Sequence, residues 1–333
     1  MKRARWIEID ASTPQAFHDT YRYAAEARPK NAAAMVFWGV PMPHICLGVH
    51  QSRAAELAPT CSVAVARRAL GGGAVWLDRG QYCFVIVSAA NDWGAPRDWF
   101  ARGLAPLIET YRGFGLAVAK QGRDAWLDGK KIAGSGAATI GHSAVFASSF
   151  LLRFDAQSFI DAIDCPSAEY RDMLRVALQT GMTSWAAHVE PPAELHIKER
   201  FRQAVAESFQ WSIEDDALLD HEHASLCGGD DDNETENSPR AKTVRDGIKI
   251  NDATFLLQQR YAEASLTLLK SGQFLMDVCI PGIISSSLRS RLGNTLLSVP
   301  SVQKTLAQEL DAEAARLWAK RIVKLADGHA EHG

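Results

Sequence analysis

The sequence has no surplus of charge and no long apolar run. Its 36 Lys and Arg residues nearly balance 39 Asp and Glu residues, which leaves a formal net charge of −3. This composition offers no general attraction to nucleic acid or to an anionic membrane. No stretch is long and apolar enough to span a bilayer, and residues 1–12 lack the apolar core of a signal peptide. We therefore expect a cytoplasmic protein that binds neither nucleic acid nor membrane.

Cysteine is sparse, and no two cysteines stand at the spacing of a redox or metal motif. There are six in 333 residues, and none belongs to a Cys-x-x-Cys pair. Their spacing to the histidines does not match a zinc site, so we assign no metal ligand. Low cysteine density in a long chain is typical of a reducing compartment. The six residues are Cys46, Cys61, Cys83, Cys165, Cys227 and Cys279.

The chain is rich in core-forming residues, and its strand and helix patterns are mixed. Apolar residues make up 47% of it, which is enough for a full core. Apolar runs predict strands at 5–9 and 82–90, the second of them central in a sheet. Because strands and helices do not alternate regularly, we expect the α+β class. Helical patterns cover residues 12–27, 96–113, 156–163, 168–178 and 193–209.

The composition changes at residues 228–246, which are acidic, polar and rich in Gly, Asn and Ser. Such a segment is typical of a linker or a mobile loop. Its acidic run, Asp230 to Asp232, lacks a calcium-loop pattern. We therefore predict a first domain at 1–215, a linker at 216–247 and a small α+β domain at 248–328.

The small domain is expected to begin with strands and to end with helices. Two strands are predicted around the turn at Ser271 and Gly272. Helices are predicted at 285–297 and 302–326, the second with an amphipathic spacing of leucines and charges.

Three consecutive glycines, Gly71, Gly72 and Gly73, stand between an arginine pair and an apolar strand. Glycine weakens a strand, so another group is expected to approach this backbone closely. The spacing is neither that of a Rossmann fingerprint nor that of a P-loop. The segment is then either a simple turn or a bare backbone that lies along an acyl chain or acyl phosphate. Arg67 and Arg68 would meet negative charge there, and we expect one of the two to be solvated.

A second cluster, residues 122–136, carries a lysine pair into a strand that ends in small residues. Asp128 and Gly129 predict a hairpin turn. Strand alternation places Lys130 and Lys131 on opposite faces, so we expect Lys130 at a solvated hairpin tip and Lys131 inward. A lysine on a rigid strand beside glycines presents a point charge to a carbonyl or phosphate oxygen.

Together the two clusters resemble the lipoate-protein ligase A family, within the biotin and lipoate ligase and octanoyltransferase superfamily. The matching patterns are RR-x-x-GGG-x-V-x-x-D at Arg67–Asp78 and GRD…GKKIAGS at Gly122–Ser135. The segments CLGVHQS at 46–52, SFLLRFD at 149–155 and GMTSW at 181–185 are similar to the family's intervening strands and turns. The resemblance covers about residues 5–210, in the right order.

The resemblance implies a mixed-sheet catalytic domain of the biotin and lipoate ligase type with an acyl tunnel, followed by a small α+β accessory domain. It implies that lipoate and ATP, with Mg²⁺, give lipoyl-AMP and pyrophosphate. A lysine of an acceptor lipoyl domain then takes the lipoyl group as an amide and AMP is released. Such acceptors are a dehydrogenase acyltransferase subunit, the glycine-cleavage H-protein or a similar lipoate-bearing protein.

Residue by residue, the resemblance makes Lys131 the catalytic group, in contact with the acyl carbonyl and the phosphate. The residues that it implies for binding substrate and adenylate are Arg68, Gly71, Gly72, Gly73, Asp124, Gly134 and Ser135. The chain departs from the family at two points. Ala147 and Ser148 stand where the family has a histidine, and the motif GRD lacks the family's asparagine.

Two alternatives stay open. A cysteine-dependent octanoyl or lipoyl transferase of the same superfamily would need a nucleophilic thiolate. Cys165, in AIDCPSAEY, stands near the place of one such cysteine, although the rarity of reactive cysteines favours an inert thiol at a helix end. The second alternative, from another class, is a non-catalytic module that binds lipoyl domains.

Overall fold

The computed structural model describes residues 2–219, 222 and 247–328. Cys227 and most of the predicted linker at 216–247, including its acidic run, lie outside these residues. The chain divides into two compact units. The described residues of the first are 2–162, 182–219 and 222, and those of the second are 163–181 and 247–328. Residues 163–181 therefore belong with the C-terminal part, whereas the roles predicted for the two domains stay predictions.

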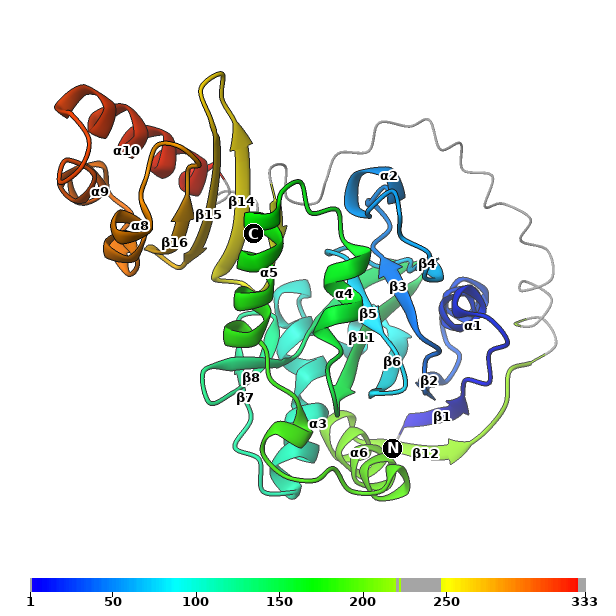
Figure 1. Cartoon of the computed structure of the whole chain (residues 1–333). Coiled ribbons are helices and arrows are strands. Elements are labelled where there is room, and N and C mark those ends of the chain that lie inside the picture. Colours follow the sequence, from blue (N-terminus) through cyan, green and yellow to red (C-terminus); the bar gives the residue numbers. More distant parts are fainter. Residues whose placement is uncertain (1, 220–221, 223–246, 329–333) are drawn as a thin grey trace. The chain divides into compact units, whose positions relative to one another are not determined.

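A six-stranded sheet forms the centre of the first unit (Figure 1). In spatial order its strands are β10 (Ser135–Ile140), β11 (Ser143–Leu151), β6 (Gln81–Ala89), β2 (Ala34–Gly39), β1 (Lys2–Glu8) and β12 (Trp211–Asp215). β1 pairs in parallel with β2 and β12, and the other neighbours are antiparallel. The predicted α+β class with a mixed sheet is confirmed, and the predicted central strand is β6.

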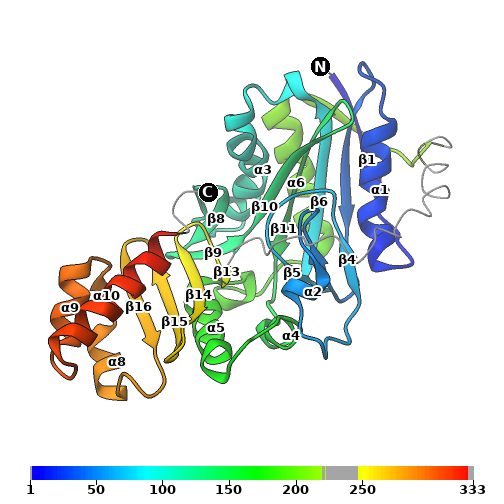
Figure 2. The same cartoon turned by 90° about the horizontal axis from the view of Figure 1, so that it is seen from above.

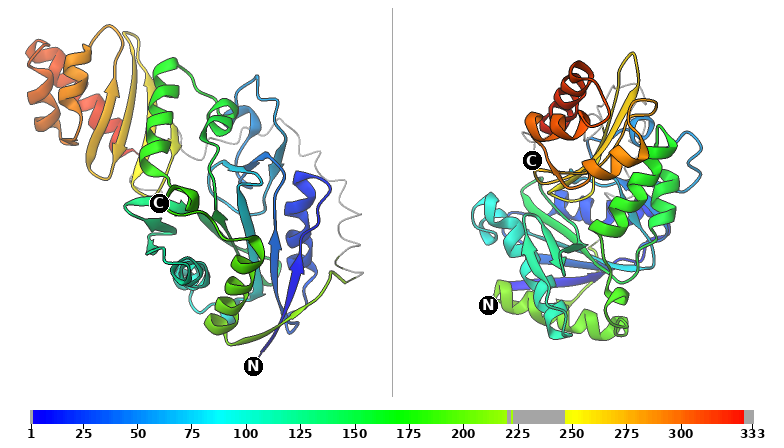
Figure 3. Two further views of the ribbon diagram at one scale, coloured as in Figure 1. Left: turned by 60° about the horizontal axis from the view of Figure 1, so that its bottom comes forward. Right: turned by 60° about the vertical axis from the view of Figure 1, so that its left-hand side comes forward.

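Helices cover both faces of this sheet. α1 (Pro14–Ala27) lies on one face, and α3 (Trp99–Gly113) and α6 (Glu194–Phe209) lie on the other (Figures 2 and 3). The alternation of β6 explains the arrangement, because Phe84 and Ile86 face α3 and α6 while Val85 and Val87 face α1. A strand buried on both faces is a continuous apolar run, as the sequence predicted.

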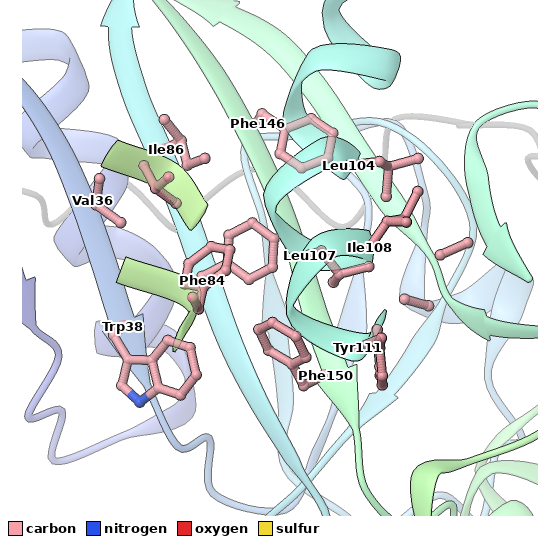
Figure 4. Packing of buried hydrophobic residues seen from close by; sticks show 14 of the residues in the cluster. Val36, Trp38, Phe84, Ile86, Leu104, Leu107, Ile108, Tyr111, Phe146 and Phe150 are labelled. Carbon is pink, nitrogen blue, oxygen red and sulfur yellow. The ribbon is translucent and has the colours of Figure 1, made fainter. Parts of the chain in front are cut away.

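Figure 4 shows the core on the α3 face of the sheet. The labelled side chains are Val36, Trp38, Phe84, Ile86, Leu104, Leu107, Ile108, Tyr111, Phe146 and Phe150, all of them buried. Burial of one such aliphatic or aromatic side chain contributes roughly 1.5–3 kcal/mol. This packing holds β6 and β11 rigid, and both strands lie beside the segments that carry the predicted site.

Two three-stranded sheets complete the first unit. One contains β4 (Val65–Arg67), β3 (His44–Leu47) and β5 (Val75–Leu77), and the other β7 (Ala119–Gln121), β8 (Asp124–Leu127) and β9 (Lys130–Ala133). Asp128 and Gly129 have φ of 49° and 75°, which are the angles of the predicted hairpin turn. The short helices are α2 (Arg53–Glu56), α4 (Ala156–Ala162), η1 (Ala90–Asp92), η2 (Pro96–Asp98) and η3 (Trp185–Ala187).

The second unit is a five-stranded antiparallel sheet with helices. Its strands are, in order, β13 (Gly247–Lys249), β14 (Thr254–Arg260), β15 (Ser265–Ser271), β16 (Phe274–Cys279) and β17 (Thr295–Leu296). Its helices are α5 (Ala168–Gly181), α8 (Ser286–Leu292), α9 (Val299–Leu306) and α10 (Ala312–Asp327). The last three share a core with the sheet, and α5 contacts β14 and β15. No helix among the described residues is both long and apolar enough to cross a bilayer.

Three predictions for this unit are wrong in detail. The sheet has five strands rather than two. The helix predicted at 302–326 is two helices, because Asp311 caps α10 by accepting a hydrogen bond from the Ala314 amide. The helix predicted at 285–297 ends at Leu292, because Asn294 has φ of 63° and turns the chain into β17.

Candidate active site

The β8–β9 hairpin positions Lys131. The backbone of Lys131 pairs with Trp126 on one side and bridges to Met182 on the other. Its carbonyl oxygen accepts a hydrogen bond of 2.9 Å from the Thr183 amide. A residue with backbone partners on both sides has a fixed Cα position, so the direction of its side chain is restricted. The Lys131 side chain is 17% exposed, in line with its predicted inward position. Lys130 is also only partly exposed, so the predicted contrast between a solvated Lys130 and an inward Lys131 is not seen.

The Lys131 ammonium is paired with a buried carboxylate. Its Nζ lies 3.0 Å from Asp124 Oδ1, and the two side chains are 17% and 7% exposed. A Cβ atom added at Gly134 would lie 3.1 Å from this Nζ. The missing side chain at Gly134 therefore makes room for the end of the Lys131 side chain, which lies between this glycine and the Asp124 carboxylate.

Hydrogen bonds anchor the start of β10 to its neighbours. Ser148 Oγ, on β11, donates to the Gly134 carbonyl oxygen at 2.7 Å. Ser135 Oγ donates to the carbonyl oxygen of Arg123. Ser148, one of the two residues expected where the family has a histidine, thus bonds to the chain's own backbone. Of the predicted binding residues, Asp124, Gly134 and Ser135 lie together around Lys131.

The three glycines form the loop between β4 and β5, and Arg68 holds this loop. Arg68 Nη2 donates to the carbonyl oxygens of Gly71 and Gly73 at 2.9 and 2.7 Å. Gly72 has φ of 95°, a conformation that favours glycine. A Cβ at Gly48 would overlap the Gly72 carbonyl oxygen, so the loop packs directly on the end of β3. A Cβ at Gly71 or Gly73 would meet nothing within 4 Å.

Both arginines of the pair have protein partners, so the expectation that one is solvated is wrong. Arg67 Nη1 donates to the carbonyl oxygens of Gly48 and Gln51 at 3.1 and 2.5 Å. Arg68 Nη1 donates to the Cys46 carbonyl oxygen at 3.1 Å. Backbone carbonyls that are not used in a sheet are strong acceptors, and each guanidinium carries five donors in a fixed plane. The pair therefore organises the loop from within.

The glycine loop and the lysine hairpin lie in the same region of the first unit. Leu70 Cδ1 lies 3.4 Å from the position of a Cβ at Gly136, two residues beyond Gly134. Leu70 is 1% exposed and packs among buried residues of β6 and β11. The Leu70 carbonyl oxygen accepts from the Val49 amide at 2.9 Å. One apolar side chain therefore joins the two motifs, while the acyl tunnel stays a prediction.

A polar cluster that the sequence analysis did not single out lies next to Arg68 and consists of His18, His44 and Cys46. Arg68 Nη1 is 3.6 Å from Cys46 Sγ. Burial by itself raises the pKa of this thiol, but the Arg68 guanidinium beside it holds the pKa below its ordinary value. Burial, with the charge of Arg68, lowers the pKa of the neighbouring His18 to about 3, so this imidazole is neutral at neutral pH.

Cys165, the nucleophile of the alternative hypothesis, belongs to the second unit and precedes α5. It is half-buried and not disulfide-bonded. The predicted catalytic lysine belongs to the first unit. Asp124, Gly134 and Ser135 therefore lie in the same unit as Lys131, whereas Cys165 belongs to the other unit.

Known structures share this fold. The bipartite lipoate protein ligase of an archaeal lipoylation system from Thermoplasma acidophilum, described with its E2 lipoyl domain, has a TM-score of 0.62 at 16% identity, over 68% of this chain and 91% of that one. A lipoate-protein ligase A bound with ATP has a TM-score of 0.56 at 16% identity, over 68% of this chain and 92% of that one. P. falciparum LipL1 in complex with lipoate has a TM-score of 0.51 at 14% identity, over 96% of this chain and 100% of that one. At these identities the likeness concerns the fold alone.

At the level of sequence, no curated protein matches the chain. The lipoyl protein ligase A/B catalytic domain family matches residues 13–210. The matched range contains the glycine loop and the lysine hairpin, so the resemblance predicted from these two motifs is confirmed. Because the match covers more than half of the 333 residues, the chain belongs to the lipoyl protein ligase A/B catalytic domain family.

Proposed function

We propose that the protein is an ATP-dependent lipoate–protein ligase. A carboxylate oxygen of lipoate attacks the α-phosphorus of ATP, and pyrophosphate leaves. The neutral amine of an acceptor lysine then attacks the acyl carbonyl of lipoyl-AMP, AMP leaves, and the nitrogen loses a proton to give the amide. The observation that carries the proposal is the Lys131 ammonium, held by Asp124 in the same unit as a loop of open glycines, in a chain of this family.

Lys131 is the group that meets developing negative charge. Attack on a mixed anhydride places charge on the carbonyl oxygen, and a prepositioned ammonium stabilises that charge with little reorganisation. The ion pair with Asp124 holds the ammonium until a substrate oxygen competes for it. The acceptor amine must be neutral to attack, and partial desolvation lowers the pKa of an amine in this direction.

The residues present fit a nucleotide with its magnesium ion. Gly71 and Gly73 carry no side chain that would keep a phosphate from the backbone, and backbone amides of glycine-rich loops are suited to phosphate oxygens. Mg²⁺ is usually held by one or two carboxylates together with substrate phosphates, and Asp124 is a buried carboxylate beside Lys131. When bound, the ion neutralises part of the phosphate charge.

The acyl substrate and the acceptor follow from the same proposal. Lipoate carries a saturated chain, and burial contributes about 0.8 kcal/mol per CH₂ group, so the predicted tunnel would supply much of the acyl affinity. The acceptor is a lipoyl domain, as in the archaeal system whose ligase shares this fold. The second unit would act as the accessory domain. The structure of P. falciparum LipL1 with lipoate matches over 96% of the chain and so includes a part like the second unit, which supports this role.

The deciding experiment incubates an acceptor lipoyl domain with the full chain and lipoate, and measures the mass of the acceptor. We expect the mass of a lipoyl amide only when both ATP and Mg²⁺ are present. Octanoate in place of lipoate tests acyl preference. Transfer from octanoyl-acyl carrier protein without ATP, abolished in Cys165→Ser, would instead establish the transferase. Acceptor binding without modification under any condition would establish the binding module.

A further inference from the structure

Three potential metal ligands meet in the interior of the first unit. His44 and Cys46 are two residues apart on β3, so their side chains share one face of the strand, and His18 reaches them from α1. His44 and Cys46 are 0% exposed and His18 is 4% exposed. Their ligand atoms all lie within 4.8 Å of one another. They are surrounded by an apolar cluster that includes Phe17, Leu77 and Cys83.

The outer hydrogen bonds of the two histidines direct their inner nitrogens to one point. His44 Nδ1 lies 2.7 Å from the Met42 carbonyl oxygen, so it carries the proton and leaves the Nε2 lone pair free. His18 Nδ1 lies 3.3 Å from the Tyr21 hydroxyl. The two Nε2 atoms face each other at 3.0 Å. A backbone carbonyl on the outer ring nitrogen is the usual support of a metal-bound histidine.

We propose that His18 Nε2, His44 Nε2 and Cys46 Sγ bind one thiophilic transition-metal ion, separately from the Lys131 site. Two imidazoles and one thiolate form a ligand set suited to Zn²⁺ and to Cu⁺. Three protein ligands leave one position of a tetrahedral ion open. The set contains a single negative charge, and none of the three ligands is a carboxylate, so an ion of low charge fits it best.

Binding of the ion releases one proton to solvent and moves another from one nitrogen of His18 to the other. The Cys46 thiol loses its proton to solvent when the sulfur binds the ion. His18 donates to His44 through Nε2–H without metal, and with metal that proton moves to Nδ1, where it can donate to the Tyr21 oxygen. His44 keeps its Nδ1–H bond to Met42. Arg68 loses its contact with the sulfur but keeps its carbonyl acceptors in the glycine loop.

The test uses the full chain, reduced and stripped of metal, with Co²⁺ as the spectroscopic probe. We expect one equivalent of Co²⁺ to give a thiolate-to-cobalt absorption band that Zn²⁺ abolishes by displacement. The affinity for Cu⁺, measured in competition with a chelator, shows whether the site prefers an ion of lower charge to Zn²⁺. Because the ligand atoms are buried, each ion is added both to folded protein and during refolding.

Cys46→Ser and His18→Gln should each weaken binding by more than the roughly 10–100-fold that loss of an outer-shell partner costs. Cys83→Ser is the matched control, because Cys83 lies in the same apolar cluster but outside the ligand set. Its affinity should equal that of the wild type. Circular dichroism establishes that each variant is folded.

Two results would overturn the proposal: no stoichiometric binding of any of the three ions to the wild type, or equal binding by Cys46→Ser. If the variants do not fold, X-ray absorption of the zinc-loaded wild type decides instead. One sulfur and two imidazoles in the first coordination shell support the site, and a shell without sulfur refutes it. None of these readouts depends on lipoyl transfer, so the proposed ligase activity stands or fails separately.

Discussion

Two cations of the first unit lie beside glycines, and they are held in different ways. Arg68 donates to backbone carbonyl oxygens of the loop that it supports, so its donors are engaged by the fold itself. Lys131 is held by the carboxylate of Asp124 and stands against Gly134. A planar guanidinium with several backbone acceptors is suited to fixing geometry, whereas a compact ammonium readily exchanges one oxygen partner for another. From this contrast we propose that Arg68 holds the loop and that Lys131 takes part in the chemistry.

The largest effect is expected from Lys131. Lys131→Ala should lower the rate of lipoyl transfer about 100–1000-fold, the range for loss of one preorganised group that faces developing negative charge. Lys130→Ala, next to it on β9, is the matched control and should keep the wild-type rate. Initial rates by mass spectrometry of the acceptor domain check both.

Because Lys131→Ala also removes the ion-pair partner of the buried Asp124, thermal unfolding is measured alongside the rates. A large loss of rate in a variant that is folded at the assay temperature supports a chemical role. A wild-type rate in Lys131→Ala would show that the site is wrongly assigned.

The second effect concerns the packing of the glycine loop on β3. Gly48→Ala forces a methyl group against the Gly72 carbonyl oxygen, and we expect it to destabilise the first unit by about 1–3 kcal/mol, as overpacking does. Gly73→Ala meets nothing within 4 Å and should change the free energy of unfolding by less than about 0.5 kcal/mol. Urea denaturation compares the two variants.

Gly73→Ala also tests whether the loop backbone faces a substrate. If it does, the KM for ATP or lipoate should rise in this variant although its stability is unchanged. Unchanged KM values for both substrates would place the substrates elsewhere.

A smaller effect than that of Lys131→Ala or Gly48→Ala is expected from Arg68→Lys, which keeps the charge but loses the planar set of donors. We expect a loss of about 1–2 kcal/mol in the free energy of unfolding, because loop carbonyl oxygens lose hydrogen bonds. KM should rise more than kcat falls, since the loop is loosened and the Lys131 ammonium is intact. Steady-state kinetics beside urea denaturation measure both. A fall in kcat as large as that of Lys131→Ala, without loss of stability, would give Arg68 a direct catalytic role.

Features that depend on a few neighbouring residues could be predicted from the sequence. The turn at Asp128 and Gly129, the central strand at 82–90 and the helix at 96–113 follow from turn chemistry and apolar periodicity. The inward position of Lys131 follows from strand alternation once the turn is placed. Where two helices share one core, the same logic failed. The leucine pattern continues through the break before Asp311, since α9 and α10 bury side chains in the same cluster.

Features that depend on distant segments could not be predicted. His44 and Cys46 are close in sequence, but His18 is 26 residues from His44 and reaches it only because α1 packs on the sheet. The same holds for Arg68, whose acceptors are carbonyls of β3 and of the returning loop. A side chain's partners are set by the return path of the chain, which no local pattern contains.

By itself, the sequence determined the family, the α+β class and the order of the two motifs, because these are written in residue types at short spacing. Only the tertiary structure decided that Lys131 pairs with Asp124, that Leu70 lies between the motifs, and that Arg68 holds the loop. The physical reason is that charge pairing and close packing act over a few ångströms in space, whatever the separation along the chain.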